Sequence, residues 1–254
     1  MYDILFIMKN IPIPKGILFD MDGVLLVAPQ SSDQSWRHVS QQFAPLLDLS
    51  SQQLEEALRV SRDQYQREIE HDSQKQRRDR LEPFETRRET VERALERLAK
   101  GDTALATEMV HVFESFREKR QLSSSALDTL RMLRDRSLPL ALISNGNAAY
   151  QRRKIEQHHL ALFFDVILIE QEFGVAKPDP RIFLAALHQL HITAQDAWMV
   201  GDDLAFDIAA SQELHIFAIL CDLEKRGLPE GGSVHPDQTI HALPELLDLL
   251  AQHS

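Results

Sequence analysis

Two aspartates, Asp20 and Asp22, stand one residue apart directly after a short apolar run. The run, residues 16–19, predicts a buried strand that ends abruptly, so both carboxylates fall at its carboxyl end. Alternate residues of a strand point to one face, where two like charges repel each other. The pair therefore indicates a chemical role. Either a cation lies between the two acids, or one carboxylate attacks the substrate while the other carries a proton. Gly23 allows the backbone to turn sharply away.

The two carboxylates can take different roles in a group-transfer reaction. An ionised carboxylate needs no activating base, only an electrophile such as phosphorus held in line, so Asp20 is the candidate nucleophile. Asp22 is the candidate acid and base, which protonates the leaving oxygen and later deprotonates the attacking water. The alternative for the pair is an acidic turn without a chemical role.

Two further segments are suited to a phosphate group. Ser144 closes an apolar run, and its hydroxyl and the backbone N–H groups of Asn145 and Gly146 can hold phosphate oxygens at a strand-to-helix turn. Lys177 lies in a proline-stiffened loop, where its ammonium can stabilise the charge of a transferring phosphoryl group. The alternatives are a simple helix cap at Ser144 or Asn145 and an exposed loop lysine.

A third acidic segment contains Asp202, Asp203 and Asp207 and follows a further apolar run. Mg²⁺ takes oxygen ligands and uses only one or two carboxylates beside its waters. Asp20 and Asp202 are the candidate carboxylate ligands. Asp203 or Asp207 can orient the waters or Lys177 from behind. For Asp207 the alternative is a charge that complements a helix dipole.

Short apolar runs alternate with helical stretches over residues 14–23 and 126–250, which predicts a parallel sheet with helices on both faces. Ligands of such sheets bind beyond the carboxyl ends of the strands, where Asp20, Ser144 and Asp202 fall. The predicted strands are Ile17–Phe19, Leu138–Ile143, Val166–Ile169, Trp198–Val200 and Ile216–Leu220, and the predicted helices are 124–136, 147–160, 180–191, 204–213 and 243–251. The sequence thus predicts an α/β, Rossmann-like core.

Residues 27–123 have a different sequence pattern, with apolar residues at helical spacing and without the alternation of apolar and polar residues that indicates strands. They predict an all-helical domain inserted between core segments 1–26 and 124–254, where it would act as a lid over the aspartates. Arginines in this insertion alternate with acidic residues, which favours a solvated helix face over a substrate-binding patch. Its aromatic residues, Trp36, Phe43, Tyr65 and Phe84, are interpreted as core of the insertion rather than a surface for a substrate ring.

Four segments, in this order and at this approximate spacing, resemble the motifs of the haloacid dehalogenase superfamily of phosphohydrolases: FDMDGV, LISNG, the lysine of GVAKPDPRIF and GDDLAFD. The resemblance covers residues 14–23 and about 124–225, and the helical insertion resembles the C1 cap of subfamily I. Val24 stands where many members carry Thr. The resemblance implies the roles assigned above to Asp20 and Asp22. It also implies Mg²⁺ ligation by Asp20, Asp202 and the main-chain carbonyl of Asp22, and phosphate binding by Ser144 and Lys177.

The expected function is a Mg²⁺-dependent phosphatase that hydrolyses a small phosphorylated metabolite through an aspartyl-phosphate. One alternative is a sugar-phosphate mutase, which shares every core residue. Another is a metal-free haloacid dehalogenase, which would need neither Asp22 as acid and base nor a paired acidic metal site. A non-enzymatic module on a degenerate scaffold is disfavoured because no motif residue is missing. The sequence leaves the substrate and the oligomeric state open.

The overall composition limits the classes of binding partner and the location that we expect for the protein. The net charge of −11 argues against nonspecific binding to nucleic acid. The apolar run at residues 4–8 is too short to span a bilayer and lacks the preceding basic residues of a secretory signal, so residues 1–13 are interpreted as an extension or edge strand of a cytoplasmic protein. The single cysteine, Cys221, excludes an intramolecular disulfide and is interpreted as strand-end packing.

Overall fold

The computed structural model describes residues 11–251, so most of the predicted amino-terminal extension lies outside the described residues. The chain divides into two compact units. The first comprises Met1–Leu26, Leu122–Asn145 and Gln151–Ser254. The second comprises Val27–Gln121 and Gly146–Tyr150.

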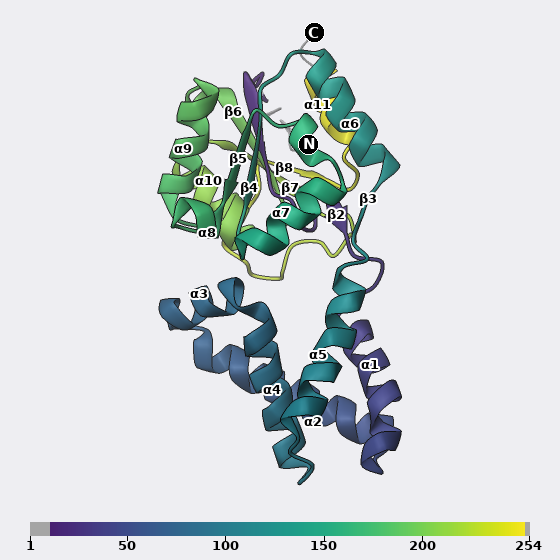
Figure 1. Cartoon of the computed structure of the whole chain (residues 1–254). Helices are drawn as coiled ribbons and strands as arrows, with labels where there is room; N and C mark the ends of the chain where they lie inside the picture. The colour runs from purple at the N-terminus through teal and green to yellow at the C-terminus, as the bar shows by residue number, and fades with distance from the viewer. Residues whose placement is uncertain (1–10, 252–254) are drawn as a thin grey trace, which may run out of the picture. The chain divides into compact units, whose positions relative to one another are not determined.

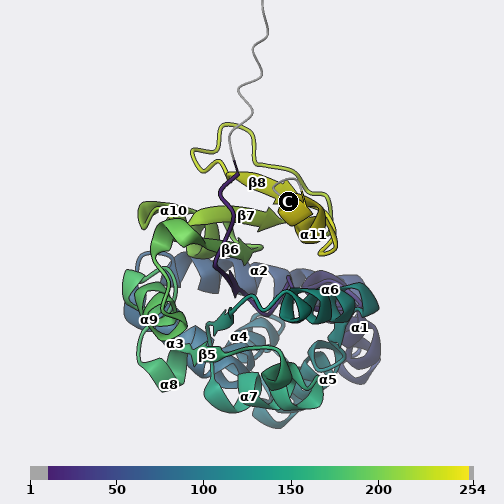
Figure 2. The same cartoon turned by 90° about the horizontal axis from the view of Figure 1, so that it is seen from above.

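The first unit is built on a six-stranded sheet in the order β5-β4-β1-β6-β7-β8, and all of its strand pairs are parallel. The strands are β1 (Gly16–Phe19), β4 (Leu140–Ser144), β5 (Val166–Ile169), β6 (Ala197–Gly201), β7 (Phe217–Cys221) and β8 (Gln238–Ile240). Figure 2 shows β6, β7 and β8 following one another across the sheet. This sheet confirms the predicted α/β, Rossmann-like core.

The central strands read as apolar runs because both of their faces are covered. Every residue of β1, β4 and β6 is buried, as expected for parallel strands between two helical layers. Helices α8, α9 and α10 flank the sheet on one side, and α6 and α11 flank it on the other (Figure 1). The helices are α6 (Ser124–Asp135), α7 (Ala148–Gln157), α8 (Glu170–Phe173), α9 (Pro180–Leu190), α10 (Ala210–Glu213) and α11 (Glu245–Ala251).

The structure differs from the predicted elements in several places. The strand predicted from Leu138 begins at Leu140, because the backbone N–H of Leu138 still closes helix α6 on the carbonyl of Leu133. The helix predicted over 204–213 is a π-helical turn at Leu204–Ala209 followed by α10. Strand β8 was not predicted, because its three residues include only one apolar side chain.

The second unit consists of helices α1 (Ser32–Phe43), α2 (Ser51–Ile69), α3 (Ser73–Leu81), α4 (Pro83–Arg97) and α5 (Thr103–Arg117), with a 3₁₀ turn at Ala44–Leu47. Side-chain caps start four of them: Ser31, Ser50, Asp72 and Asp102 each accept a hydrogen bond from a backbone N–H of the first turn. Trp36 and Phe43 lie in its apolar core and Phe84 packs against it, in agreement with the interpretation of these aromatic residues.

The chain passes from the first unit into the second and back through two short strands, β2 (Leu26–Val27) and β3 (Gln121–Leu122), which pair with each other. Within the described residues, no helix combines the length and the apolar character that crossing a bilayer requires.

Candidate active site

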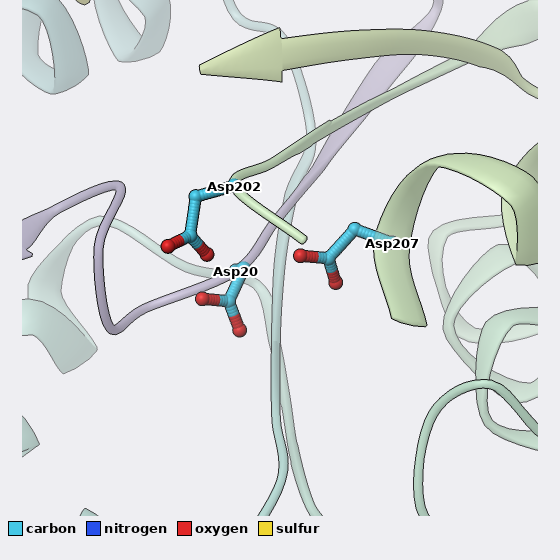
Figure 3. Close-up of side chains that lie close together, drawn as sticks. All are labelled: Asp20, Asp202 and Asp207. Carbon is cyan, nitrogen blue, oxygen red and sulfur yellow. The ribbon is translucent and has the colours of Figure 1, made fainter. Parts of the chain in front are cut away.

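Three carboxylates meet at the carboxyl edge of the sheet (Figure 3). Phe19 of β1 lies opposite Val200 of β6, so the residues that follow these two strands lie side by side. Asp20 follows β1, Asp202 follows β6, and Asp207 comes from the π-helical turn. One oxygen of each carboxylate lies within 4.8 Å of the others. Asp20 and Asp207 are buried, whereas Asp202 keeps contact with solvent.

Lys177 is buried against this cluster. Its ammonium donates hydrogen bonds of 2.6 Å to Asp20 Oδ1 and of 2.6 Å to Asp207 Oδ1. Only 2% of the residue is exposed, so the alternative of a solvated loop lysine is wrong. Burial opposes its charge, but the two carboxylates outweigh burial and raise the pKa of Lys177 above its usual value. The ammonium therefore stays charged at neutral pH.

The acids of the cluster have perturbed pKa values. Burial raises the pKa of Asp20 to about 8, with Asp207 and Asp202 adding to the rise and Lys177 opposing it. Desolvation raises the pKa of Asp202 to about 6, and repulsion from Asp207 contributes. When all three carboxylates are ionised they face a single ammonium, and a bound cation would relieve the repulsion that contributes to the raised pKa values of Asp20 and Asp202. The donor atoms are all carboxylate oxygens, the type that Mg²⁺ prefers, so these residues fit a magnesium site.

Two glycines allow the acids to approach so closely. A Cβ atom at position 23 would lie 2.0 Å from Asp202 Oδ2, and one at position 201 would lie 2.2 Å from the Cβ of Asp207. Gly23 also has a φ of +90°, in the region that favours glycine. The glycines of the first and fourth motifs are therefore part of the acidic site.

The side chain of Asp22 is bound by helix α7. Lys154 Nζ donates to its two oxygens at 2.9 and 2.7 Å, and Gln151 Nε2 lies 3.1 Å from Asp22 Oδ2. Gln151 also donates to the hydroxyl of Ser144 at 2.7 Å. Sequence reasoning missed Gln151 and Lys154. The available signal was their spacing of three residues in the helix after Ser144, which places both on one helical face.

The segment of Ser144 and the loop of Lys177 are joined. Asn145 Nδ2 donates to the carbonyl of Lys177 at 2.8 Å, and the N–H of Lys177 donates to Asn145 Oδ1 at 2.8 Å. Ser144 is buried at the end of β4. Asn147, rather than Ser144 or Asn145, accepts a hydrogen bond from the first turn of α7 through its side chain, so the helix-cap alternative is not supported. Gly146 has a φ of +115°, which a glycine adopts without strain.

Asp203 lies beside the cluster and caps the π-helical turn. Its Oδ1 accepts hydrogen bonds of 2.8 Å from the backbone N–H groups of Ala205 and Phe206. Its own N–H donates to Asp207 Oδ2 at 3.2 Å. Asp203 therefore positions the turn and the carboxylate of Asp207, and Asp207 does more than complement a helix dipole.

A parallel α/β core with an acidic, lysine-containing site at its carboxyl edge defines a class of hydrolases. Residues 14–215 match the model of the haloacid dehalogenase-like hydrolases, and the chain belongs to this family. A phosphoserine phosphatase of Thermus thermophilus is 36% identical over 162 residues, 63% of each chain. A ribulose-1,5-bisphosphate 5-phosphatase of Halopiger xanaduensis is 30% identical over 55% of this chain and 61% of its own.

Among solved structures, a 2-haloacid dehalogenase of Pseudomonas syringae is 26% identical, with a TM-score of 0.63. The alignment covers 95% of this chain and 100% of that one. The chain thus spans less than two thirds of the length of the two curated relatives and the whole length of this solved structure.

Proposed function

We propose that the protein is a Mg²⁺-dependent phosphatase that hydrolyses a small phosphate monoester through an aspartyl-phosphate on Asp20. The observation that carries the proposal is the buried Lys177 ammonium, in contact with both Asp20 and Asp207 in a site with excess negative charge. The names of the two curated relatives, both phosphatases, support the same activity. We place the protein in the cytoplasm, without nucleic acid or membrane as a partner.

The proposed chemistry has two halves. In the first, an Asp20 oxygen forms a bond to phosphorus while the ester P–O bond breaks, and Asp22 gives a proton to the departing alcohol oxygen. In the second, Asp22 takes a proton from water, whose oxygen attacks phosphorus and releases Asp20. Lys154 and Gln151 hold the Asp22 side chain through the hydrogen bonds described above.

Charge stabilisation comes from groups on several loops. Lys177 neutralises part of the charge on the transferring phosphoryl group, the usual dominant contribution in this chemistry. Ser144, with the backbone N–H groups of Asn145 and Gly146, holds phosphate oxygens. Asp20, Asp202 and the main-chain carbonyl of Asp22 would hold Mg²⁺. Bound there, the ion supplies positive charge that lets the phosphate approach the acidic cluster.

We further propose that the helical insertion, residues 27–123, is the cap of subfamily I and selects the organic portion of the substrate. A cap of this kind excludes bulk water during the reaction. Removal of its selecting side chains would change the ranking of substrates more than the rate of phosphoryl transfer.

A haloacid dehalogenase is a second candidate because the solved dehalogenase is 26% identical to this chain. The presence of both Asp22 and Asp202 favours the phosphatase, since a metal-free dehalogenase needs neither. A sugar-phosphate mutase shares the core residues and differs in the fate of the phosphoryl group. A single-turnover experiment separates phosphatase from mutase by whether phosphate is released or retained on the sugar.

The direct test is Asp20→Asn, which replaces the nucleophile by an amide of the same shape. We expect turnover of phosphate monoesters to be abolished while the protein stays folded. The experiment measures phosphate release from a panel of phosphorylated metabolites with Mg²⁺ and with EDTA. Full activity of Asp20→Asn would rule out the proposed mechanism. Equal rates of phosphate release with Mg²⁺ and with EDTA would rule out the proposed metal dependence.

A further inference from the structure

Gln151 of helix α7 is a buried amide whose nitrogen donates to three oxygens. Only 5% of the residue is exposed. Its Nε2 lies 2.7 Å from Ser144 Oγ, 2.7 Å from the carbonyl oxygen of Asn145 and 3.1 Å from Asp22 Oδ2. All four residues belong to the first unit. Burial of an amide costs free energy unless new hydrogen bonds replace those to water, and here the nitrogen makes them.

The three oxygens fix which way the amide of Gln151 faces. A primary amide has two N–H donors on its nitrogen and only acceptor sites on its oxygen. The carbonyl of Asn145 has no proton to donate, so the amide nitrogen rather than the amide oxygen must face it. Gln151 Oε1 is buried and has no hydrogen-bond partner within the described part of the chain. Because an unpaired buried acceptor costs free energy, this placement favours the nitrogen contacts over those of the oxygen.

This orientation decides how Ser144 can use its hydroxyl. A serine hydroxyl has one donor and two acceptor sites. Gln151 Nε2 donates to Ser144 Oγ, so the hydroxyl proton is not used in that bond. No acceptor for this proton is found among the residues that the structure describes. With the amide reversed, Ser144 would donate to Gln151 Oε1, and its proton would no longer serve a ligand.

Ser144 and Asp22 approach the amide from neighbouring strands. Phe19 of β1 lies opposite Leu142 of β4, and Ser144 ends β4. Asp22 lies in the loop after β1, and 26% of its side chain is exposed. The hydrogen bonds around Gln151 therefore connect the buried hydroxyl of Ser144 to a part of the site that solvent reaches.

Ser144 depends on Gln151 more than Asp22 does. Lys154 Nζ donates to both oxygens of Asp22, at 2.9 and 2.7 Å, so this carboxylate keeps a donor when Gln151 is replaced. Within residues 11–251, Ser144 Oγ accepts a hydrogen bond from Gln151 alone. Loss of the amide would therefore change the hydroxyl of Ser144 more than the carboxylate of Asp22.

We propose that Gln151 is a positioning residue for phosphate binding. Its amide holds Ser144 Oγ as an acceptor, so that the hydroxyl proton is directed to a phosphate oxygen. Donors that are fixed in advance toward the oxygens on phosphorus stabilise their charge without reorganisation. The proposal rests on the phosphatase function proposed above and adds to it a residue outside the four motifs.

The first test measures the affinity for inorganic phosphate with Mg²⁺ by calorimetry. Gln151→Met removes the amide and keeps the length of the side chain. We expect it to weaken phosphate binding roughly tenfold, as Ser144→Ala does, since both remove the same hydrogen bond to a charged group. The double variant should bind phosphate within about twofold of Ser144→Ala, because Gln151 acts through the hydroxyl. Losses that add, or wild-type affinity in Gln151→Met, would overturn the proposal.

Thr129→Val is the matched control for the loss of a buried hydrogen bond. Thr129 is 2% exposed and donates to the carbonyl of Ser125 at 2.8 Å within helix α6, which flanks the sheet. We expect its affinity for inorganic phosphate to stay within about twofold of that of the wild-type protein. A tenfold loss in Thr129→Val would show that any lost buried hydrogen bond weakens the site, and the assignment to Gln151 would fail.

Steady-state kinetics separate positioning from a structural role. A hydrogen bond to phosphate that is present in both the ground state and the transition state changes KM and leaves kcat nearly unchanged. We therefore expect Gln151→Met to raise KM roughly tenfold, with kcat within about threefold of the wild-type value, for any ester that the wild-type protein hydrolyses. A structural loss reduces the fraction of folded enzyme, which lowers kcat at an unchanged KM, and that result would contradict the proposal.

A crystal structure of the wild-type protein with Mg²⁺ and orthovanadate tests the same contact without a variant, should Gln151→Met not fold. We expect Ser144 Oγ to lie within hydrogen-bond distance of a vanadate oxygen while Gln151 Nε2 still donates to Ser144 Oγ. An amide turned away from Ser144 would overturn the proposal. Vanadate bound without a contact to Ser144, or no bound vanadate, would also overturn it.

These outcomes separate the role of Gln151 from the proposed function. If the wild-type protein hydrolyses no ester but Gln151→Met weakens phosphate binding as expected, the positioning role stands and the phosphatase is rejected. If the wild-type protein hydrolyses esters and Gln151→Met behaves like it, the phosphatase stands and the positioning role is rejected. Absence of phosphate binding by the wild-type protein rejects the positioning role.

Discussion

Gly23 and Asp202 stand so close that a side chain on the first would displace the second. A Cβ atom at position 23 would lie 2.0 Å from Asp202 Oδ2. The glycine of the first motif therefore sets the position of a carboxylate almost two hundred residues later in the chain. This relationship leads to a prediction that separates backbone strain from loss of the site.

Gly23→Ala should lower both stability and cation affinity. The positive φ is expected to cost about 1–3 kcal/mol in unfolding free energy, and the clash with Asp202 should weaken Mg²⁺ binding by roughly tenfold or more. Gly174→Ala is the control, because Gly174 has a φ of +97° and no atom within 4 Å of an added Cβ. Urea unfolding and Mg²⁺ titration measure the two effects. An equal loss of Mg²⁺ affinity in both variants would show that the clash with Asp202 does not affect Mg²⁺ binding.

Lys177→Met should destabilise the protein strongly. The change leaves the buried Asp20 and Asp207 without their shared counter-charge, and the loss of one partner from a buried ion pair typically costs about 3–5 kcal/mol. Lys15→Met is the matched control, since Lys15 pairs with Asp196 at the surface and such pairs contribute about 0–1 kcal/mol. Urea unfolding of both variants without metal is the measurement. Similar losses would show that Lys177 is not essential to the buried cluster.

Without metal, stability should fall as pH rises. The pKa of Asp20 is raised from 3.8 to about 8 and that of Asp202 from 3.8 to about 6, so the folded protein holds protons that the unfolded chain releases. Release of protons on unfolding favours the unfolded state as pH increases from about 4 to 8. We expect Tm in EDTA to decline over this window and Mg²⁺ to restore it at pH 8.

Asp20→Asn should flatten this decline, because it removes the group with the larger shift. Asp196→Asn is the control, since the pKa of this surface acid is lowered rather than raised. A wild-type Tm that rises between pH 5 and 8 in EDTA would contradict the assigned electrostatics.

Cys221 should be unreactive in the folded protein. Burial raises the pKa of its thiol to about 12, with Asp202 adding to the rise, so the thiolate is scarce at pH 8. We expect slow reaction with a thiol-directed disulfide reagent in native buffer and rapid reaction in urea at the same pH. The absorbance of the released thiol follows both reactions, and a fast native reaction would show that the strand end is open.

The sequence predicted the sheet well where strands are buried on both faces. Strands β1 and β6 are continuous apolar runs, and this pattern needs no knowledge of their neighbours. Their carboxyl ends meet at one edge in any parallel sheet, so the sequence predicted that Asp20 and Asp202 lie at the same edge, and the structure adds that β1 and β6 are neighbours. Strand β8, short and largely polar, carries no such pattern.

The sequence did not predict the partners of Asp22. Gln151 and Lys154 are polar residues of a helix, which ordinarily indicate a solvated face. Their contacts with Asp22 depend on how α7 is rotated against the loop after β1, a tertiary relationship that no local pattern encodes. For Asp207 the sequence left two roles open, because only the structure reveals the hydrogen bond to Lys177.

The pairing of β2 with β3 has a consequence for how this chain could be re-engineered. The insertion enters and leaves through two adjacent strands, so its ends are fixed at a constant separation whatever lies between them. A different helical module joined at the same two points would leave the register of β1 against β6 unchanged. The proposed substrate selection and the proposed phosphoryl chemistry would then lie in stretches of sequence that can be exchanged independently.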